Sequence, residues 1–188
     1  MAELENSKDL ISVLWSGADI LRSKMDANEY KDYLLGIVFY KYLSDSFLIK
    51  VYDLIYDEKP QTLKEALQAY KEALQDESAK ELKEQIQSEC HYVIEPDLTY
   101  TSFADAARNN SFNREQLQKA FNNIEQSDYL FADLFTDIDL YSNRLGTGDQ
   151  KQSDTIASLI KEIDKADLLN SDSDVLGNAY EYLIEQFA

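Results

Sequence analysis

Apolar residues recur at helical spacing along almost the whole chain. The first stripe has members at i, i+3, i+4, i+8 and i+11: Leu10, Val13, Leu14, Ala18 and Leu21. Spacings of three and four residues place side chains on one face of an α-helix. Similar stripes occupy residues 63–74, 117–124 and 156–163. The pattern therefore predicts a mainly α-helical protein, a single multi-helix domain with a bundle-like core over residues 1–188.

The second helix is predicted to be the central and most buried one. Asp26 is followed three residues later by Glu29, which is the spacing of a capping box at a helix start. Apolar residues then occur on more than one side of the expected helix: Tyr30, Tyr33, Leu34, Ile37, Val38, Leu43, Phe47, Leu48, Val51 and Leu54. A helix that is apolar on several sides is usually surrounded by other elements.

Two highly charged helices are predicted over about residues 62–89. Thr62 with Glu65 forms another capping box, and Ser78 with Glu81 marks the start of a second helix. The apolar stripes that follow are narrow, and Lys and Glu alternate on the opposite faces. Two adjacent helices of this kind predict a charged helical hairpin that projects from the core.

Residues 91–101 interrupt the helical pattern. The runs His91–Ile94 and Leu98–Tyr100 are β-prone, and the residues between them, Glu95, Pro96 and Asp97, are typical of a turn. This arrangement predicts either a short β-hairpin or an extended loop.

Two further irregular segments follow. Residues 129–141 are dense in apolar groups among aspartates, which indicates one or two short buried turns rather than a long helix. Residues 143–152 contain two of the five glycines and are expected to form a loop.

The last helix is expected over about residues 174–187. Asp174 is a natural N-cap, and Tyr180, Leu183 and Phe187 lie on one apolar face. No Gly, basic turn or Pro follows to end this helix. We therefore expect the helix to lead into a part of the protein that is missing from this chain, and its apolar face to be a domain or subunit interface.

The composition favours a folded protein that lies outside membranes. Hydrophobic residues make up 44% of the chain and aromatic residues 12%, which excludes wholesale disorder. No apolar run reaches the length of a membrane span, and the polar, acidic first residues do not form a signal peptide. The single cysteine, Cys90, excludes an internal disulfide framework and suits a reducing compartment. We expect a cytoplasmic protein.

The chain is acidic, and the charge is uneven. Its formal net charge is −18, and residues 125–188 hold 4 Lys and Arg against 14 Asp and Glu, a net charge of −10. A strongly acidic chain is unlike a stand-alone nucleic-acid binder, which uses cations to displace phosphate counterions. A solvated acidic surface explains the excess most simply. Docking of a basic partner and mimicry of DNA phosphates are the alternatives.

Residue patterns typical of catalytic and metal sites are mostly absent. The lone histidine, His91, is adjacent to Cys90, so a catalytic dyad or a metal site would need partners from elsewhere. The sequence Leu145–Asp149 contains a Gly-x-Gly but lacks the third glycine of a dinucleotide fingerprint and the Gly-Lys-Ser/Thr of a P-loop. The sequence therefore predicts no catalytic, cofactor-binding or metal-ligating residue.

Basic residues in two regions are candidates for contact with DNA phosphates. The clearest are Arg22, Lys24, Lys31, Arg144 and Lys151, and Lys41 and Lys50 extend the first group. Solvated helix faces and a flexible loop explain the same residues without any DNA.

Four segments, taken in order, resemble one known family. They are Leu14–Arg22, Met25–Gly36, Ile37–Asp45 and Asp174–Ala188. Together they resemble the N-terminal helical domain of the methyltransferase (modification) subunit of type I restriction–modification systems. The resemblance is close over about residues 10–47 and 174–188, and looser over residues 95–170.

The resemblance implies a subunit that, when whole, transfers a methyl group from S-adenosylmethionine to N6 of adenine in DNA. Two such subunits assemble with one specificity subunit, and a restriction subunit can join them. The helical domain takes part in assembly and in closing around DNA. The family's Asn/Asp-Pro-Pro-Tyr/Phe motif is absent, since the only prolines are Pro60 and Pro96. The resemblance therefore implies that the last helix leads to a catalytic domain missing from this chain, and that the chain has no catalytic activity itself. The alternatives are an independent acidic interaction module and a DNA mimic.

Overall fold

A computed structural model describes residues 2–167 together with Glu181 and Glu185, and it describes side chains from Leu10 onward. This part of the chain is helical, without strands. Its elements are α1 (Ala2–Leu21), α2 (Ala27–Tyr56), α3 (Leu63–Ala73), α4 (Ala79–Cys90), η1 (Pro96–Leu98), α5 (Tyr100–Arg108), α6 (Arg114–Ser127), η2 (Tyr129–Phe131) and α7 (Asp149–Ile163). The mainly α-helical class is confirmed. The expected last helix, with Tyr180, Leu183 and Phe187, lies outside the described residues.

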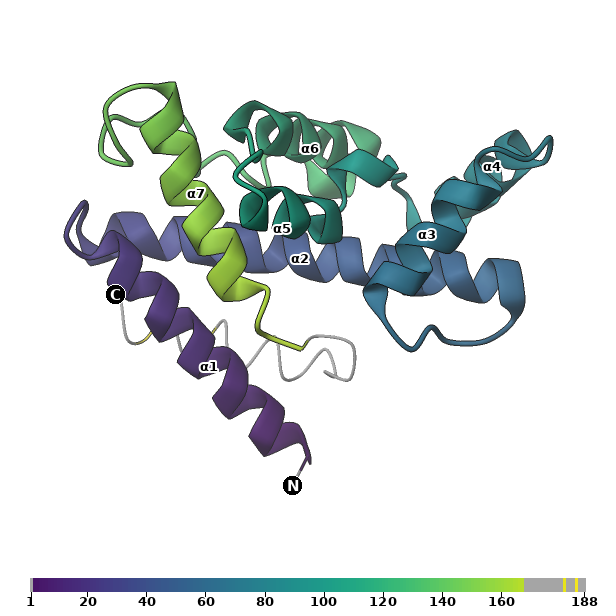
Figure 1. Ribbon diagram of the computed structural model, residues 1–188, viewed down its shortest axis with the longest axis horizontal. Helices are drawn as coiled ribbons and strands as arrows, with labels where there is room; N and C mark the ends of the chain where they lie inside the picture. Colours follow the sequence, from purple (N-terminus) through teal and green to yellow (C-terminus); the bar gives the residue numbers. More distant parts are fainter. Residues whose placement is uncertain (1, 168–180, 182–184, 186–188) are drawn as a thin grey trace.

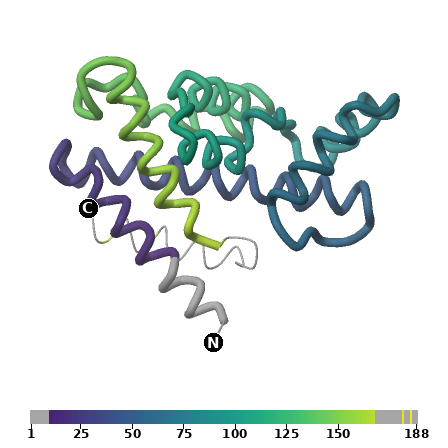
Figure 2. Tube along the Cα trace, in the orientation of Figure 1, coloured from purple at the N-terminus to yellow at the C-terminus, as the bar shows by residue number. Residues whose placement is uncertain are grey.

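Helix α2 is the axis of the domain. It is 30 residues long, and α1, α3, α5 and α7 pack against it (Figure 1). Helices α1 and α7 pack against each other and against one part of α2, whereas α3 packs against its C-terminal part. The tube trace in Figure 2 shows the same arrangement, with α5 and α6 on one side of α2. The prediction that this helix is central and most buried is confirmed.

The core is a set of aromatic rings around the middle of α2. Tyr40 is fully buried, and its ring centroid lies 5.6 Å from that of Phe121 in α6 and 6.1 Å from those of Phe103 and Phe135. Phe121 and Phe135 stack face to face at 4.1 Å. Large rings bury much apolar surface, so this cluster joins α2, α5, α6 and the segment after η2.

Local capping explains several of the helix starts. The Asp26 side chain accepts from the backbone N–H of Glu29 at 3.2 Å. At α3 the box is reciprocal, because Thr62 accepts from the N–H of Glu65 and the Glu65 carboxylate accepts from the N–H of Gln61. Helix α4 starts after Ser78, as predicted, although the Ser78 side chain makes no capping hydrogen bond.

Helices α3 and α4 lie at the end of α2 remote from the α1–α2 turn (Figure 1). Tyr70 of α3 is fully buried, and its ring lies edge-on to that of Phe47 at 5.4 Å. Within α4, Ile86 alone is buried. Helix α3 is thus part of the core, and α4 is mostly exposed.

The segment over residues 91–101 is an extended stretch followed by η1 and the start of α5, so the extended loop is correct and the hairpin is not. Its polar groups pair with helices instead of a second strand. Tyr92 donates its hydroxyl proton to the carbonyl of Leu43 at 2.8 Å, and Tyr70 donates to the carbonyl of Ile94 at 2.9 Å. Thr99 then caps α5 by accepting from the N–H of Ser102.

Residues 129–141 form short turns, as predicted, but they are only partly buried. Phe135, Ile138 and Leu140 face the core, whereas Tyr129 and Leu130 are exposed. No helix in the described part of the chain combines the length and the apolar character that crossing a membrane requires.

Candidate functional site

Most residues of the two predicted basic groups lie together at one end of the domain: Arg22, Lys24, Lys31, Arg144 and Lys151. The Tyr33 hydroxyl donates to the carbonyl of Asp139 at 2.5 Å, and Arg144 forms an ion pair with Glu29 in the first turn of α2. These contacts hold the loop before α7 against the N-terminal part of α2. Figure 1 shows this loop, the α1–α2 turn and the start of α2 at the same end of the molecule.

Only some of these cations are available to a ligand. Arg22 is paired with Asp19 at 2.9 Å, and Arg144 is paired with Glu29. Lys24, Lys31 and Lys151 form no ion pair with the described residues. Lys24 and Lys151 are exposed and Lys31 is half-buried.

The two other lysines of the first group lie elsewhere. Lys41 is 2% exposed and forms an ion pair with Asp45, so it cannot reach a DNA phosphate on the surface. Lys50 is paired with Glu89 of α4 at 2.8 Å. The helical path of α2 carries both side chains away from the end that holds Lys24 and Lys31.

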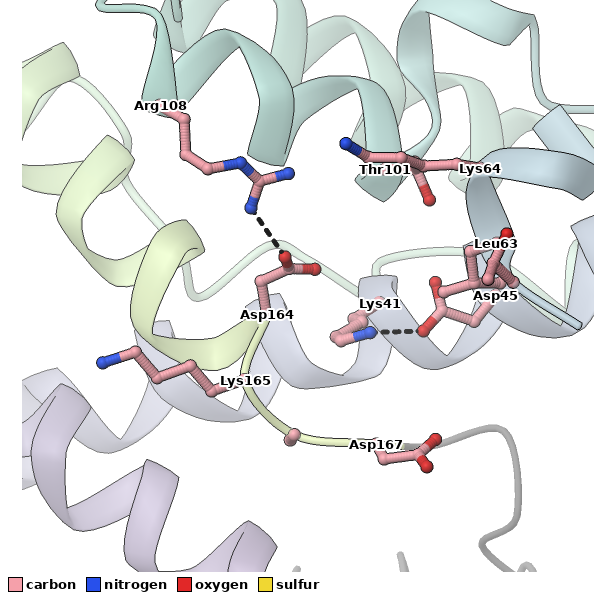
Figure 3. Close-up of a pocket in the computed structure, with 11 residues that line it drawn as sticks. Lys41, Asp45, Leu63, Lys64, Thr101, Arg108, Asp164, Lys165 and Asp167 are labelled. Atoms are coloured by element: carbon pink, nitrogen blue, oxygen red, sulfur yellow. Dashed lines mark hydrogen bonds and ion pairs between the residues drawn. The ribbon is translucent and has the colours of Figure 1, made fainter. Parts of the chain in front are cut away.

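A polar pocket that the sequence pattern did not predict lies where four helices meet (Figure 3). Its volume is about 280 Å³, and its walls come from α2, the start of α3, α5 and the end of α7. The lining includes Lys41, Asp45, Lys64, Thr101 and Arg108. Only the i, i+4 spacing of a Lys and an Asp inside the apolar run Tyr40–Leu48 could have indicated it.

The buried pair in the wall of this pocket is incompletely satisfied. Asp45 accepts from the ammonium group of Lys41 through one carboxylate oxygen, and its Oδ1 atom has no hydrogen-bond partner. Burial raises the pKa of Asp45 to about 6, although the nearby Lys41 charge opposes that shift. The Lys41 ammonium also lies 5.3 Å from the centre of the Tyr100 ring, a favourable position for a cation.

The rim of the pocket is a network of opposite charges. Arg108 pairs with Asp164 at 3.0 Å (Figure 3). Arg108 also pairs with Asp105 at 2.6 Å, and Lys64 lies 3.5 Å from Asp105. Such a wall offers a hydrogen-bond acceptor to a small polar group but no nucleophile with an adjacent base. Its geometry is that of a structural junction between helices.

The geometry of Cys90 and His91 does not form a catalytic dyad. The His91 ring is exposed, and its Nδ1 atom lies 3.4 Å from a carboxylate oxygen of Asp128. Burial raises the pKa of the Cys90 thiol, which disfavours the reactive thiolate. Among the residues that the structure describes, no cluster of His, Cys, Asp and Glu could hold a metal ion.

Comparison with known proteins agrees with the resemblance seen in the sequence. The model of the HsdM N-terminal domain family matches residues 10–163. The chain is 26% identical over 189 residues to the type I restriction enzyme MpnII methylase subunit of Mycoplasma pneumoniae, covering 93% of this chain and 34% of that protein.

A solved structure has the same fold. The methyltransferase subunit of a type I restriction–modification system from Streptococcus thermophilus is 49% identical to this chain, with a TM-score of 0.89. The match covers 97% of this chain and 39% of that one. The chain thus spans about a third to two fifths of these relatives, and it belongs to the HsdM N-terminal domain family, the N-terminal helical domain of type I restriction–modification methyltransferase subunits.

Proposed function

We propose that this chain is the assembly and DNA-clamping domain of a subunit that methylates N6 of adenine in DNA, with S-adenosylmethionine as methyl donor. The observation that carries the proposal is the family match over residues 10–163, within relatives named as methylase or methyltransferase subunits. The chemistry belongs to the part of the relatives that this chain does not span. The specificity subunit, a second methyltransferase subunit and the restriction subunit are the proposed partners.

The site geometry supports an accessory role. The described residues hold a polar junction between helices and, at one end of the domain, three lysines that form no ion pair with described residues. An enzyme that acts on a base must take it out of the duplex and enclose it, so it needs elements that grip the DNA backbone around the pocket. Lys24, Lys31 and Lys151 are the proposed phosphate contacts of this domain.

The experiment that tests the proposed activity uses the full-length subunit with its specificity subunit, target duplex DNA and S-adenosylmethionine. The DNA is then digested, and its nucleosides are identified by mass spectrometry. N6-methyl-2′-deoxyadenosine is the expected product. A methylated cytosine, or no methylated base at all, would refute the proposed activity.

A further inference from the structure

One turn carries three of the five large apolar side chains that are exposed among the described residues. We name residues 128–139 the acidic aromatic turn; it contains η2. Within it Tyr129 is 85% exposed, Leu130 is 64% exposed and Leu134 is 39% exposed. Among described residues, two other large apolar side chains are comparably exposed, Tyr56 and Tyr141, and they lie outside this turn. Clustered exposed apolar side chains commonly mark an interaction site.

The turn is held in place from beneath. The Phe131 ring lies edge-on to Tyr92 at 5.6 Å, and Phe135 stacks on Phe121 at 4.1 Å. The Asp128 carboxylate accepts from the N–H of Leu130 at 3.0 Å, which fixes the start of η2. A surface that is already ordered loses little conformational entropy on binding, so its apolar contacts contribute more fully to affinity.

The segment that carries these side chains has charge of one sign. From residue 120 to residue 143 the chain has no Lys or Arg, but it has five carboxylates: Glu125, Asp128, Asp133, Asp137 and Asp139. Asp133, Asp137 and Asp139 are exposed. Burial, and after it the nearby Asp137 charge, raise the pKa of the Asp32 carboxyl of α2, whereas the Lys31 charge lowers it. The exposed apolar group is therefore rimmed by negative charge.

This combination discriminates between partners. DNA is disfavoured at the turn because its phosphates would meet the exposed carboxylates of a segment that has no Lys or Arg of its own. A symmetric contact between two copies of the chain would bring the same carboxylates face to face. A different protein segment with Arg or Lys beside apolar side chains fits both features, since a cation can also lie over the exposed Tyr129 ring.

We propose that the acidic aromatic turn is the docking surface for a basic, partly apolar segment of a non-identical subunit in the assembled enzyme. Tyr129 and Leu130 supply the apolar contact, and Asp133 and Asp137 attract and orient the basic groups. The partner's place in a methyltransferase complex rests on the function proposed above.

The test measures association of the full-length subunit with the specificity subunit by calorimetry. Tyr129→Ala with Leu130→Ala should weaken the Kd about tenfold or more, because truncation of exposed anchors at an interface centre removes most of their contact. Asp133→Asn with Asp137→Asn should weaken the Kd several-fold at low salt and little at high salt, because salt screens the attraction between exposed charges. Tyr56→Ala with Glu58→Gln, exposed positions at the other end of α2, is the matched control and should leave the Kd unchanged.

The outcomes separate this inference from the proposed function. All altered side chains are exposed or partly exposed, so each variant is expected to fold. An unchanged midpoint of thermal unfolding checks that it does. A complex that forms with unchanged Kd in both turn variants overturns the inference and leaves the proposed function standing. The same holds if the variants weaken self-association or DNA binding instead. Failure of the unaltered subunit to bind the specificity subunit refutes the proposed assembly role and this docking surface together.

Discussion

Gly36 shows how one residue sets the position of a distant segment. Glycine in the middle of a helix costs roughly 1 kcal/mol relative to alanine, yet a Cβ atom at this position would lie 1.8 Å from Cδ1 of Ile138. The missing side chain therefore lets the turn after η2 pack against α2.

Gly36→Ala should destabilise the domain by about 1–3 kcal/mol, because the overpacking cost exceeds the gain in helix propensity. Urea unfolding of the purified chain measures the change. Ser88→Ala on the exposed surface of α4 is the control and should be neutral or slightly stabilising. Equal or greater stability of Gly36→Ala would show that Ile138 moves aside without cost.

The buried Lys41–Asp45 pair makes a second residue-scale prediction. Lys41→Met leaves the Asp45 carboxylate buried without its cation and should cost about 3–5 kcal/mol at pH 7. The double replacement Lys41→Met with Asp45→Leu removes both charges and should come close to the stability of the unaltered chain. Guanidinium unfolding of all three proteins measures this. A single variant as stable as the double one would contradict the prediction.

The same pair predicts an unusual dependence of stability on pH. The pKa of Asp45 is about 6 in the folded chain and about 4 in an unfolded one. Between these values the folded state binds more protons, so stability falls as pH rises from about 4 to about 6 and then levels off. The loss approaches about 3 kcal/mol, at 1.36 kcal/mol for each unit of pKa difference.

The measurement is the free energy of unfolding from pH 4 to pH 7, compared between the unaltered chain and the double Lys41→Met, Asp45→Leu variant. As pH rises, the free energy of unfolding of the double variant should increase relative to that of the unaltered chain. A difference that is independent of pH would show that Asp45 titrates alike in the folded and unfolded states.

At the scale of elements, Tyr100 joins three helices. Its hydroxyl donates to the carbonyl of Ile160 in α7 at 2.8 Å, and its backbone N–H donates to the hydroxyl of Ser44 in α2 at 2.8 Å. The Ile160 carbonyl also accepts from the N–H of Asp164. Tyr100 therefore ties the start of α5 to both neighbours.

Tyr100→Phe should cost about 0.5–1.5 kcal/mol, the net value of one hydrogen bond, because the Ile160 carbonyl keeps its other partner. Thermal unfolding followed by circular dichroism can measure this. Tyr129→Phe, which alters an exposed hydroxyl, should have no measurable effect. A cost well above this range would mean that removal of the hydroxyl disturbs the packing of α5 on α7.

The helices were predictable from the sequence because their signals are local. Periodic apolar residues and the caps at Asp26, Thr62 and Asn113 lie within a turn or two of the structure they specify. The stretch over residues 91–101 was ambiguous because Tyr92 and Ile94 find their hydrogen-bond partners in α2 and α3. No local pattern could have distinguished those partners from a second strand.

At the scale of the whole molecule, the unpaired lysines predict a weak, salt-dependent contact with DNA in the assembled enzyme. Lys24→Gln, Lys31→Gln and Lys151→Gln combined should weaken target binding at low salt. The slope of log K against log salt should fall by about 0.9 for each phosphate that is no longer neutralised by a lysine. Fluorescence anisotropy of labelled duplex across a salt series measures both.

The control for that series is a triple replacement by glutamine at lysines that are exposed on other helices: Lys71, Lys80 and Lys119. It changes the net charge by the same amount. It should therefore reproduce any effect of net charge on DNA binding, but not an effect of lysines at the N-terminal end of α2. If the two triple variants weaken DNA binding equally, the proposed phosphate contacts are refuted.

The sequence by itself determined the helical class, the central place of α2 and membership of the family, because periodicity, caps and contiguous motifs are properties of short segments. Only the tertiary structure decided which of the described charged side chains form ion pairs and which do not. The chain path buried Lys41 against Asp45, paired Arg144 with Glu29 and left Lys24, Lys31 and Lys151 without an ion pair among the described residues. It also exposed Tyr129 and Leu130 on a base of stacked rings. Both results depend on contacts between residues far apart in the chain, since burial and charge pairing are set by what packs nearby.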